Sequence, residues 1–295
     1  MNYPKISIVT PNFNGDKYLE ETIQSVLSQN YPNLEYIIID GGSTDNSVAI
    51  IKKYENQLKY WVSETDKGLY DAVQKGFDQS TGEIMAWINS DDLYHIKSLF
   101  SIAEIFKMNE VNWLQGNPSF FDEQGRIVSV GGLKKWSKLD FYLGNYKWIQ
   151  QESVFWRRTL WEKAGGQMDV KMKYAGDLEL WLRFFRYEKL YVTTSLLGGF
   201  RLRSEGQLSL DFLEDYIEEA ECKIRYELEN KLSIEENKLI QKIKDYNYFV
   251  GKIRFKLLKR IVIKLFYSRI VKLQKVNFSY SPIIHFDRVT QSFKI

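Results

Sequence analysis

The chain has 295 residues and a net charge of +3, and 44% of its residues are hydrophobic, enough for one large domain with an appendage or for two small domains. Its single cysteine, Cys222, excludes an intramolecular disulfide and indicates a reducing, cytoplasmic compartment. The N-terminal residues lack the basic and apolar stretches of a signal peptide, and no uncharged apolar run reaches about 18 residues, so we expect no membrane-spanning helix.

The first third of the chain alternates short apolar runs with amphipathic stretches. We expect strands at Lys5 to Thr10, Leu34 to Ile39, Tyr60 to Val62 and Ile84 to Ile88, and helices at Tyr18 to Gln29, Asp45 to Tyr54 and Leu69 to Phe77. Strands separated by helices of this length form right-handed βαβ units. The pattern therefore predicts an α/β fold with a mostly parallel central sheet flanked by helices.

The pattern loosens after about residue 110. Val111 to Gln115 is a candidate strand, and the residues around Gln124 and Gly125 indicate a hairpin. A helix opens at Asp177, and Leu210 to Lys244 is charged and helical, with no strand signal.

Four polar clusters follow directly after predicted strands. They are Thr10-Pro11-Asn12, Asp40-Gly41-Gly42-Ser43, Glu64 to Gly68, and Asn89 to Asp92. Because parallel strands place their carboxyl ends along one edge, we expect these clusters to converge, although any one of them alone could be a turn or a helix cap. Asp40 is an acceptor suited to a ribose hydroxyl or a base N–H. No Gly-x-Gly-x-x-Gly or P-loop pattern occurs, which disfavours a dinucleotide or P-loop site.

Asn89-Ser90-Asp91-Asp92 ends the apolar run Ile84 to Ile88 with two adjacent carboxylates. Carboxylate oxygens suit Mg²⁺ or Mn²⁺, which in turn bind phosphate oxygens. The alternative is a helix N-cap with a spare acid, because Asp caps helices well.

The segments from Ser7 to Ser47 and from Ser63 to Asp92 carry these motifs in an order that resembles the family 2 glycosyltransferases. That family is inverting and has the GT-A nucleotide-diphospho-sugar transferase fold. The resemblance implies a GT-A catalytic domain at residues 1–205, with nucleotide-sugar binding up to about residue 110 and the acceptor side at 111–205. Residues 206–295 are then a helical, basic C-terminal extension.

The resemblance also implies roles for individual residues on the donor side. The residues expected to bind the donor are Thr10, Pro11, Asn14, Asp40, Asp66, Lys67, Gly68 and Asp91. Asn89 to Asp92 matches the family's Asp-x-Asp-type metal motif, so Asp92, together with Asp91, is the expected ligand of a divalent Mg²⁺ or Mn²⁺.

The second half of the chain continues the resemblance. Ile149 to Gly166 is similar to the family's acceptor-side segment, which implies that Gln151 and Glu152 line the acceptor site, unless they are a buried structural pair. Tyr174 to Phe184 is similar to the helix with the catalytic base, and Asp177 falls on the base position. An ordinary helix N-cap is the alternative for Asp177.

One departure lies near the end of the similarity. Many relatives have a pattern like Phe-Arg-x-His, whereas this chain reads Phe200-Arg201-Leu202-Arg203. Arginine cannot ligate a metal, but Arg201 and Arg203 can bind a diphosphate through charge-assisted hydrogen bonds.

The function implied is transfer of a sugar from a nucleotide-diphosphate sugar, with UDP the commonest nucleotide and GDP or dTDP also open. The expected acceptor is a glycan or a lipid-linked sugar in bacterial surface polysaccharide biosynthesis. A nucleotidyltransferase is one alternative, but the loop from Pro11 to Gly15 lacks the basic residues that its phosphate loop needs. A non-catalytic scaffold is the other, and it has no need for Asp40, Asp91, Asp92 and Asp177 together.

The C-terminal region is strongly basic. From Gly251 to Ile295 there are eleven Lys/Arg residues and one acid, Asp287. Lys252 to Lys275 places nine of these among apolar residues at helical spacing, which predicts an interfacial helix on an anionic membrane surface at the inner face of the cell membrane. The alternative is a helix packed on the catalytic domain. Nucleic acid is not expected, because no recognised binding motif accompanies the charge.

Overall fold

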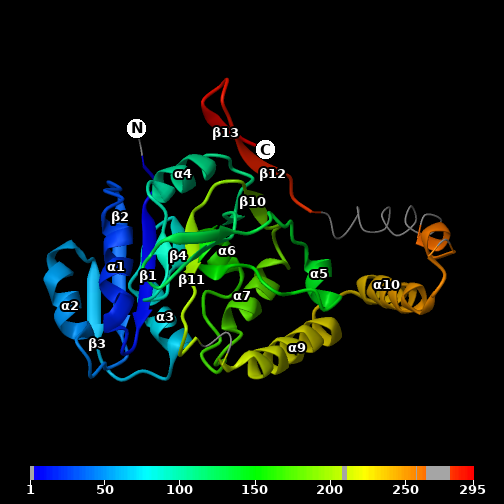
Figure 1. Cartoon of the computed structure of the whole chain (residues 1–295), viewed down its shortest axis with the longest axis horizontal. Helices are drawn as coiled ribbons and strands as arrows, with labels where there is room; N and C mark the ends of the chain where they lie inside the picture. Colours follow the sequence, from blue (N-terminus) through cyan, green and yellow to red (C-terminus); the bar gives the residue numbers. More distant parts are fainter. Residues whose placement is uncertain (1–2, 208–210, 257, 264–279) are drawn as a thin grey trace.

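The computed structural model describes residues 3–207, 211–256, 258–263 and 280–295, and Figure 1 shows their arrangement. The main sheet contains β1 (Ile6–Asn12), β2 (Leu34–Asp40), β3 (Tyr60–Ser63), β4 (Ile84–Trp87), β6 (Trp113–Gln115), β9 (Val154–Arg157), β10 (Tyr191–Thr193), β12 (Ile283–Asp287) and β13 (Ser292–Lys294). A smaller sheet contains β5 (Leu93–Tyr94), β7 (Ser119–Phe121), β8 (Ile127–Val130) and β11 (Gly198–Arg201).

Helices cover both faces of the main sheet. They are α1 (Asp16–Leu27), α2 (Ser47–Tyr54), α3 (Leu69–Asp78), α4 (Ser98–Ile105), α5 (Lys138–Tyr142), α6 (Arg158–Lys163), α7 (Gly176–Phe184), α9 (Leu213–Asn230) and α10 (Ile234–Lys252), with short 3-10 turns η1 (Glu55–Gln57) and η2 (Gln151–Ser153). The predicted α/β fold with helices flanking a central sheet is confirmed.

The central strands are apolar along their length because both of their faces are buried. Successive side chains of β1 point to opposite faces, so Ile8 packs with α1, α2 and α4, while Val9 packs with α3 and α7. Every residue of β1 is buried. The strands and helices predicted for the first third of the chain are confirmed, and each of their ends lies within two residues of the predicted one.

The main sheet follows the order β13-β12-β10-β6-β9-β4-β1-β2-β3. Pairing is parallel from β4 through β1 and β2 to β3, and again from β6 through β10 to β12. Strand β9 runs antiparallel between β4 and β6. The carboxyl ends of β4 and β6 and the start of β9 therefore lie on the same edge of the sheet.

The C-terminal extension is helical only in part. Its helices α9 and α10 pack on the catalytic domain, since Ala220 and Ile240 belong to the same hydrophobic core as α7. Residues 283–294 form β12 and β13 instead, and this part of the helical expectation is wrong. The reason is that Ile284 is fully buried when β12 pairs with the edge of β10.

The basic segment from Lys252 to Lys275 lies largely outside the described residues. Among those that the structure does describe, no helix is both long and apolar enough to cross a membrane.

Candidate active site

Asp40 lies where β1 and β2 end, at the centre of the donor-side loops. The parallel register sets Asn12 beside it, and Asn12 Nδ2 donates to Asp40 Oδ1 at 2.7 Å. Ser43 donates through Oγ at 2.6 Å and through its backbone N–H at 2.9 Å, and Ser63 Oγ donates at 2.6 Å. Burial alone would raise the pKa of Asp40, but these hydrogen bonds outweigh it and lower the pKa. Asp40 is thus an ionised, fully buried group that joins three loops.

The other donor residues predicted from β1 lie around Asp40. Thr10 is fully buried and shares a 3.0 Å hydrogen bond with the Tyr36 hydroxyl, and Pro11 is buried beside it. Asn14 is exposed at a φ of 50°, and its Oδ1 accepts the Thr44 N–H at 2.9 Å. Thr10 and Pro11 therefore form the floor of this region, whereas Asn14 lies at its surface.

Asp66 follows β3 and lies against the Asp40 loop. A Cβ built on Gly41 would lie only 2.7 Å from Asp66 Oδ2, so the Asp66 carboxylate is in close contact with the Asp40 loop. The Gly68 N–H donates to Asp66 Oδ1 at 2.8 Å, and burial raises the pKa of Asp66. Lys67 is exposed at the tip of the same loop.

The acidic turn Asn89 to Asp92 follows β4 and leads directly into β5. A Cβ built on Gly15 would lie 2.3 Å from Asn12 Oδ1 and 2.9 Å from Ser90 Oγ, so the fourth polar cluster lies close to the first. The predicted convergence of the four clusters is confirmed. The helix-cap alternative for this turn is wrong, because the next helix begins only at Ser98.

Asp92 is fully buried, and its carboxylate is held from two directions. Its Oδ1 accepts the Arg201 backbone N–H at 2.9 Å, and Asn89 Nδ2 donates to Oδ2 at 3.3 Å. Thr22 Oγ1 donates to the Asp92 carbonyl at 2.8 Å. Contacts from α1 and β11 thus fix the turn in place.

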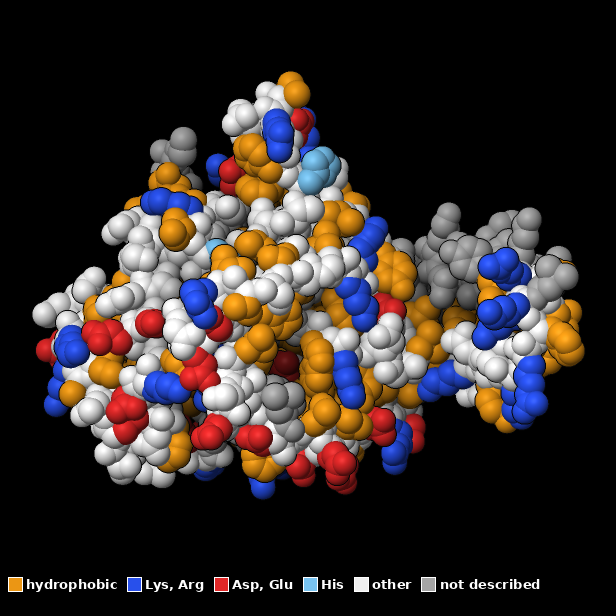
Figure 2. Space-filling view, viewed as in Figure 1, with side chains coloured by type: hydrophobic (Ala, Val, Ile, Leu, Met, Phe, Trp, Pro, Cys, Tyr) orange, Lys and Arg blue, Asp and Glu red, His pale blue; other side chains and the backbone are white. Residues whose placement is uncertain are grey.

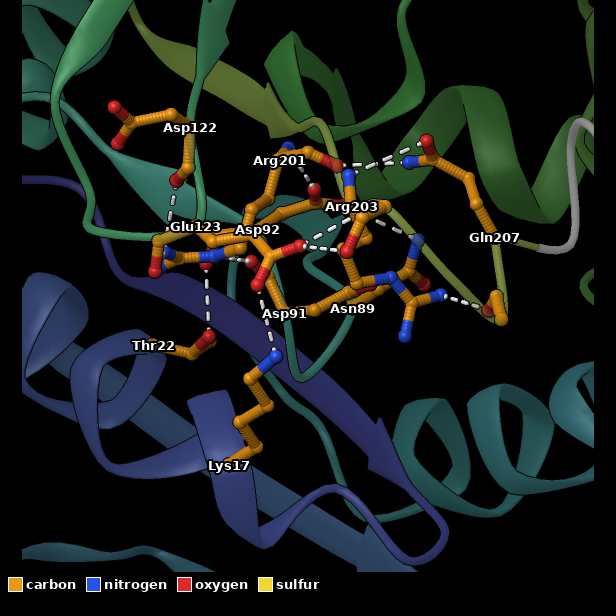
Figure 3. A network of polar contacts seen from close by, with 12 residues as sticks. Lys17, Thr22, Asn89, Asp91, Asp92, Asp122, Glu123, Arg201, Arg203 and Gln207 are labelled. Atoms are coloured by element: carbon orange, nitrogen blue, oxygen red, sulfur yellow. Dashed lines mark hydrogen bonds and ion pairs between the residues drawn. The ribbon is translucent and has the colours of Figure 1, made fainter.

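The Arg201 side chain supports the acidic turn from behind (Figure 3). Its Nε donates to the Asp91 carbonyl at 2.6 Å and its NH2 to Glu21 Oε2 at 2.6 Å. NH1 donates at 3.1 Å to the carbonyls of both Asp122 and Glu123. Because this fully buried guanidinium already donates to four acceptor oxygens, the expected binding of a diphosphate by Arg201 would require it to give up some of these bonds.

Arg203 differs from Arg201 in facing the acidic turn. Its Nε lies 3.1 Å from Asp91 Oδ2, and its NH2 donates to the Gly206 carbonyl at 2.6 Å. Gln207 Nε2 donates to the Arg201 carbonyl at 2.8 Å, which fastens the loop after β11 (Figure 3). Arg203 therefore sits as a countercharge on Asp91, at 24% side-chain exposure.

Gln151 and Glu152 lie in η2, at the start of β9. Gln151 Nε2 donates to the Trp87 carbonyl at 2.7 Å, which ties η2 to the end of β4. Glu152 Oε1 is buried without a hydrogen-bond partner in the described part of the chain. A Cβ built on Gly198 would lie 2.0 Å from the Glu152 carbonyl oxygen, so β11 can approach η2 only with glycine at position 198.

Asp177 lies in the first turn of α7, one residue inside the helix that begins at Gly176. The cap position is Ala175, so the N-cap alternative for Asp177 is wrong. Its Oδ1 is buried, with no hydrogen-bond partner among residues that the structure describes. The buried rings of Tyr70 and Tyr216 lie close enough that the charge of Asp177 adds to the effect of burial in raising their pKa values.

Four acidic side chains form one electrostatic unit on this edge of the sheet. Burial, with a further contribution from the charges of Asp91 and Asp177, raises the pKa of Glu152 to about 8. Burial also raises the pKa of Asp177 to about 7 and holds the pKa of Asp92 well above its ordinary value. Figure 2 shows a hollow in this face of the molecule, with an acidic side chain at its floor and hydrophobic side chains around it. A cluster of acidic side chains with raised pKa values favours binding of protons or of a cation near neutral pH.

The oxygen atoms around the acidic turn are suited to bind a divalent cation. Asn89 Oδ1 and Glu152 Oε1 are buried oxygens that no described residue satisfies, and such oxygens suit Mg²⁺ and Mn²⁺. No three acidic, His or Cys side chains within the described ranges already form a metal cage. Mg²⁺ commonly takes one or two carboxylates and completes its shell with water and substrate phosphates, which matches Asp91 and Asp92.

Sequence reasoning did not single out Tyr70, Tyr216 or Gly198. Tyr216 is in α9, outside the segment that resembles the family, and its place beside Asp177 depends on how α9 packs. Gly198 gave no signal, because the need for glycine comes from a contact with Glu152 that is distant in sequence.

The family model described as Glycosyl transferase family 2 matches residues 7–164. The chain belongs to glycosyl transferase family 2. It is a glycosyltransferase, as the motifs predicted. A relative named as an uncharacterized glycosyltransferase of Mycobacterium tuberculosis (strain CDC 1551 / Oshkosh) is 38% identical over 188 residues, which cover 61% of this chain and 68% of the relative. Another, from Rickettsia typhi (strain ATCC VR-144 / Wilmington), is 28% identical over 222 residues, covering 72% and 69%.

Solved structures of S. aureus TarS share the fold. TarS 1-349 in complex with UDP-GlcNAc matches with a TM-score of 0.65 and 20% identity, covering 85% of this chain and 77% of that one. TarS 1-349 in complex with UDP matches with a TM-score of 0.63 and 20% identity, covering 85% and 76%. The expected GT-A fold is confirmed.

Proposed function

We propose that this glycosyltransferase moves a sugar from a nucleotide-diphosphate sugar to an acceptor hydroxyl by a single displacement with inversion. The observation that carries the proposal is the group of four acidic side chains beside the converged donor loops: the buried Asp92 and Glu152 with the partly buried Asp91 and Asp177. UDP is the proposed nucleotide, because the TarS structures of the same fold are complexes with UDP-GlcNAc and UDP.

The nucleotide occupies the loops after β1, β2 and β3 in this proposal. Asp66 and Lys67 are accessible there for the base and ribose, with Gly68 permitting close approach. Thr10, Pro11 and Asn14 shape the pocket. Direct contact of Asp40 with the nucleotide requires Ser43 or Ser63 to give up its hydrogen bond to that carboxylate.

The diphosphate lies near the acidic turn, where Asp92 and Asp91 would hold a divalent ion. The chemistry that Mg²⁺ or Mn²⁺ supplies there is neutralisation of the negative charge on the departing diphosphate. Arg203 now pairs with Asp91 at 3.1 Å, and it can transfer to a phosphate oxygen when the donor enters.

Asp177 is the proposed general base. Its buried, unpartnered Oδ1 can accept the proton of an acceptor hydroxyl, and burial has brought its pKa to about 7, close to the value that base catalysis at neutral pH favours. Gln151 and Glu152 lie between the acidic turn and the acceptor side, and we propose that they contact the acceptor.

The test is turnover of a nucleotide-sugar panel by the full chain. UDP-, GDP- and dTDP-sugars are incubated with and without Mn²⁺, and release of the nucleoside diphosphate is measured. We expect slow release from one UDP-sugar that requires the metal. Release of pyrophosphate from a nucleoside triphosphate in place of this reaction would favour a nucleotidyltransferase, and binding of the sugar nucleotide without any release would favour a non-catalytic scaffold.

A second proposal concerns where the acceptor resides. Around the end of α10 the described basic residues Arg254, Lys256, Lys259 and Arg260 alternate with exposed Phe255, Leu258 and Ile261. Basic charge interleaved with exposed apolar side chains fits an anionic bilayer surface, at about 1 kcal/mol for each Lys or Arg. We propose that this segment holds the enzyme at the membrane, beside a lipid-linked acceptor for surface polysaccharide.

Flotation with vesicles of phosphatidylglycerol and phosphatidylcholine tests the membrane proposal. The triple change Lys256→Glu, Lys259→Glu and Arg260→Glu should abolish flotation. A control with the same change of charge on exposed lysines elsewhere, Lys52→Glu, Lys59→Glu and Lys107→Glu, should retain most of it. Equal flotation of the two variants would refute the proposal.

A further inference from the structure

Gln115 ends β6 with a buried amide that is not used by the fold. The residue is 1% exposed, and neither its Oε1 nor its Nε2 has a hydrogen-bond partner among the described residues. Gln150, close by, provides the contrast, because its amide donates to the Ser119 carbonyl at 2.8 Å and accepts the Ser119 N–H at 3.0 Å. A buried amide without partners destabilises a protein unless a ligand or water satisfies it.

Gln115 lines a cavity of about 160 Å³. Phe120 and Trp136 form apolar walls, and Lys134, Lys147 and Trp148 also line it. Trp136 is buried, whereas Trp148 is 45% exposed and Lys147 is exposed, so these last two residues form the outer rim. The cavity thus combines one free amide, aromatic surfaces and two cationic side chains.

The position of the cavity relates it to the proposed chemistry. On one side the Gly116 N–H donates to the Ser153 carbonyl at 2.9 Å, one residue from Glu152. On the other side the Trp148 ring packs on Tyr216 at a centroid distance of 4.8 Å, and Tyr216 is the ring that lies beside Asp177.

The order of the strands gives the same placement. Because β6, β9 and β4 are neighbours, the cavity at the end of β6 lies beyond η2 from the acidic turn, on the side away from the nucleotide loops of β1 to β3. A group bound there would approach Asp177 and Glu152 from the side opposite to the donor, as a single displacement requires.

From these observations we infer that the cavity is a subsite for a glycosyl unit of the acceptor that carries an anionic group such as a phosphate. Gln115 exchanges hydrogen bonds with a sugar hydroxyl, because its amide both donates and accepts. Trp136 and Phe120 cover the apolar C–H face of the ring. Lys134 and Lys147 hold the anionic group. Among the residues that the structure describes, Lys134 Nζ donates to Asn145 Oδ1 at 3.1 Å and contacts the Trp136 ring, so it has further N–H groups to offer.

This inference rests on the proposed transfer reaction, and its test is separate from that of the reaction. The full chain is labelled with 5-fluorotryptophan, and the Trp136 and Trp148 fluorine signals are assigned with Trp136→Phe and Trp148→Phe. The probes are the 1-phosphates of glucose, galactose, mannose and N-acetylglucosamine, the corresponding free sugars, and inorganic phosphate. We expect at least one sugar 1-phosphate to shift the Trp136 and Trp148 signals, and to bind about tenfold more tightly than its free sugar.

Gln115→Leu should lower the affinity for that sugar phosphate about tenfold. The melting temperature of this variant should be equal to or above that of the unsubstituted chain, because the Gln115 amide makes no hydrogen bond to any described residue. Gln150→Leu is the matched stability control, and it should melt at a lower temperature because it loses two buried hydrogen bonds. Lys147→Ala should weaken the sugar phosphate and leave the free sugar unaffected.

UDP titration separates the two proposals. If UDP binds to the chain and to Gln115→Leu equally, but no sugar phosphate shifts either tryptophan signal, the subsite is wrong and the donor function stands. Equal binding of inorganic phosphate and sugar phosphates would also overturn the subsite, because it would show a simple anion site. If sugar phosphates bind but no nucleotide or nucleotide sugar does, the proposed function fails.

Discussion

Asp177→Asn is the substitution that tests the proposed base most directly. Asparagine keeps the shape of the side chain but cannot take a proton from the acceptor. A general base typically contributes about 10²–10⁴-fold, so turnover should fall by that factor while the affinity for UDP stays within about twofold. Asp78→Asn is the matched control, because Asp78 is an exposed residue of α3 that only accepts Gln74 Nε2 at its surface.

The pH dependence of turnover tests the raised pKa of Asp177. Burial raises the pKa of Asp177 to about 7, so the carboxylate form predominates only above neutral pH. Turnover should therefore fall about fivefold between pH 7 and pH 6, where about nine-tenths of the carboxyl groups are protonated, and about a further tenfold by pH 5. An ordinary carboxylate with a pKa near 4 would show no loss over this range.

Thermal stability depends on the same pKa, but it falls with rising pH, whereas turnover rises. Since the pKa of Asp177 is raised in the folded state, the folded chain keeps that proton to higher pH than the unfolded chain does. The resulting stabilisation is complete below about pH 4 and is lost as the pH rises toward about 7. At pH 8 Asp177→Asn should melt no lower than the unsubstituted chain. Initial rates of UDP release from pH 5 to 9 and thermal melts at pH 8 measure both effects; a variant with normal turnover, or a profile flat from pH 5 to 7, would refute the assignment.

Three further outcomes are expected. Asp92→Asn should lose the Mn²⁺-dependent part of UDP affinity in calorimetry; unchanged affinity would contradict the metal assignment. Gly198→Ala should lower stability by about 2 kcal/mol, since its Cβ would lie 2.0 Å from the Glu152 carbonyl, whereas Gly132→Ala, which has open space, should be neutral in the same denaturant titration. Arg201→Met should destabilise the fold by about 3 kcal/mol by leaving the Asp91 and Asp122 carbonyls unpaired; a loss of diphosphate affinity with normal stability would show instead that Arg201 binds the donor.

The central strands could be predicted from the sequence because burial on both faces makes them continuous apolar runs. Strand β9 escaped notice, since Val154 to Arg157 passes into α6 without a Gly or Pro turn between them. Strand β12 escaped because it follows the longest basic stretch of the chain, and only its pairing with β10 makes an extended conformation favourable.

The candidate site was predictable where a short motif carried it. Asp91 and Asp92 are adjacent, and their place after a strand follows from the apolar run before them. The role of Arg201 could not be predicted, because its NH2 group pairs with Glu21, which lies 180 positions away in the sequence. A linear pattern identifies residue types at strand ends, but it does not reveal which charges already have partners.

The return of β12 to the central sheet changes what the basic segment can do. Before the basic segment, the first turn of α10 is fixed to the catalytic domain by the Lys138–Glu236 ion pair at 2.6 Å, and after it Ile284 is buried where β12 pairs with β10. The basic segment is therefore a connection between two fixed elements, α10 and β12, rather than a free tail. If this connection binds a bilayer as proposed, its two fixed ends would also determine the direction in which the catalytic hollow faces relative to the membrane. Deleting the chain from residue 251 onward would also uncover the edge of β10, and charge reversal at Lys256, Lys259 and Arg260 is therefore the cleaner test of the proposed membrane attachment.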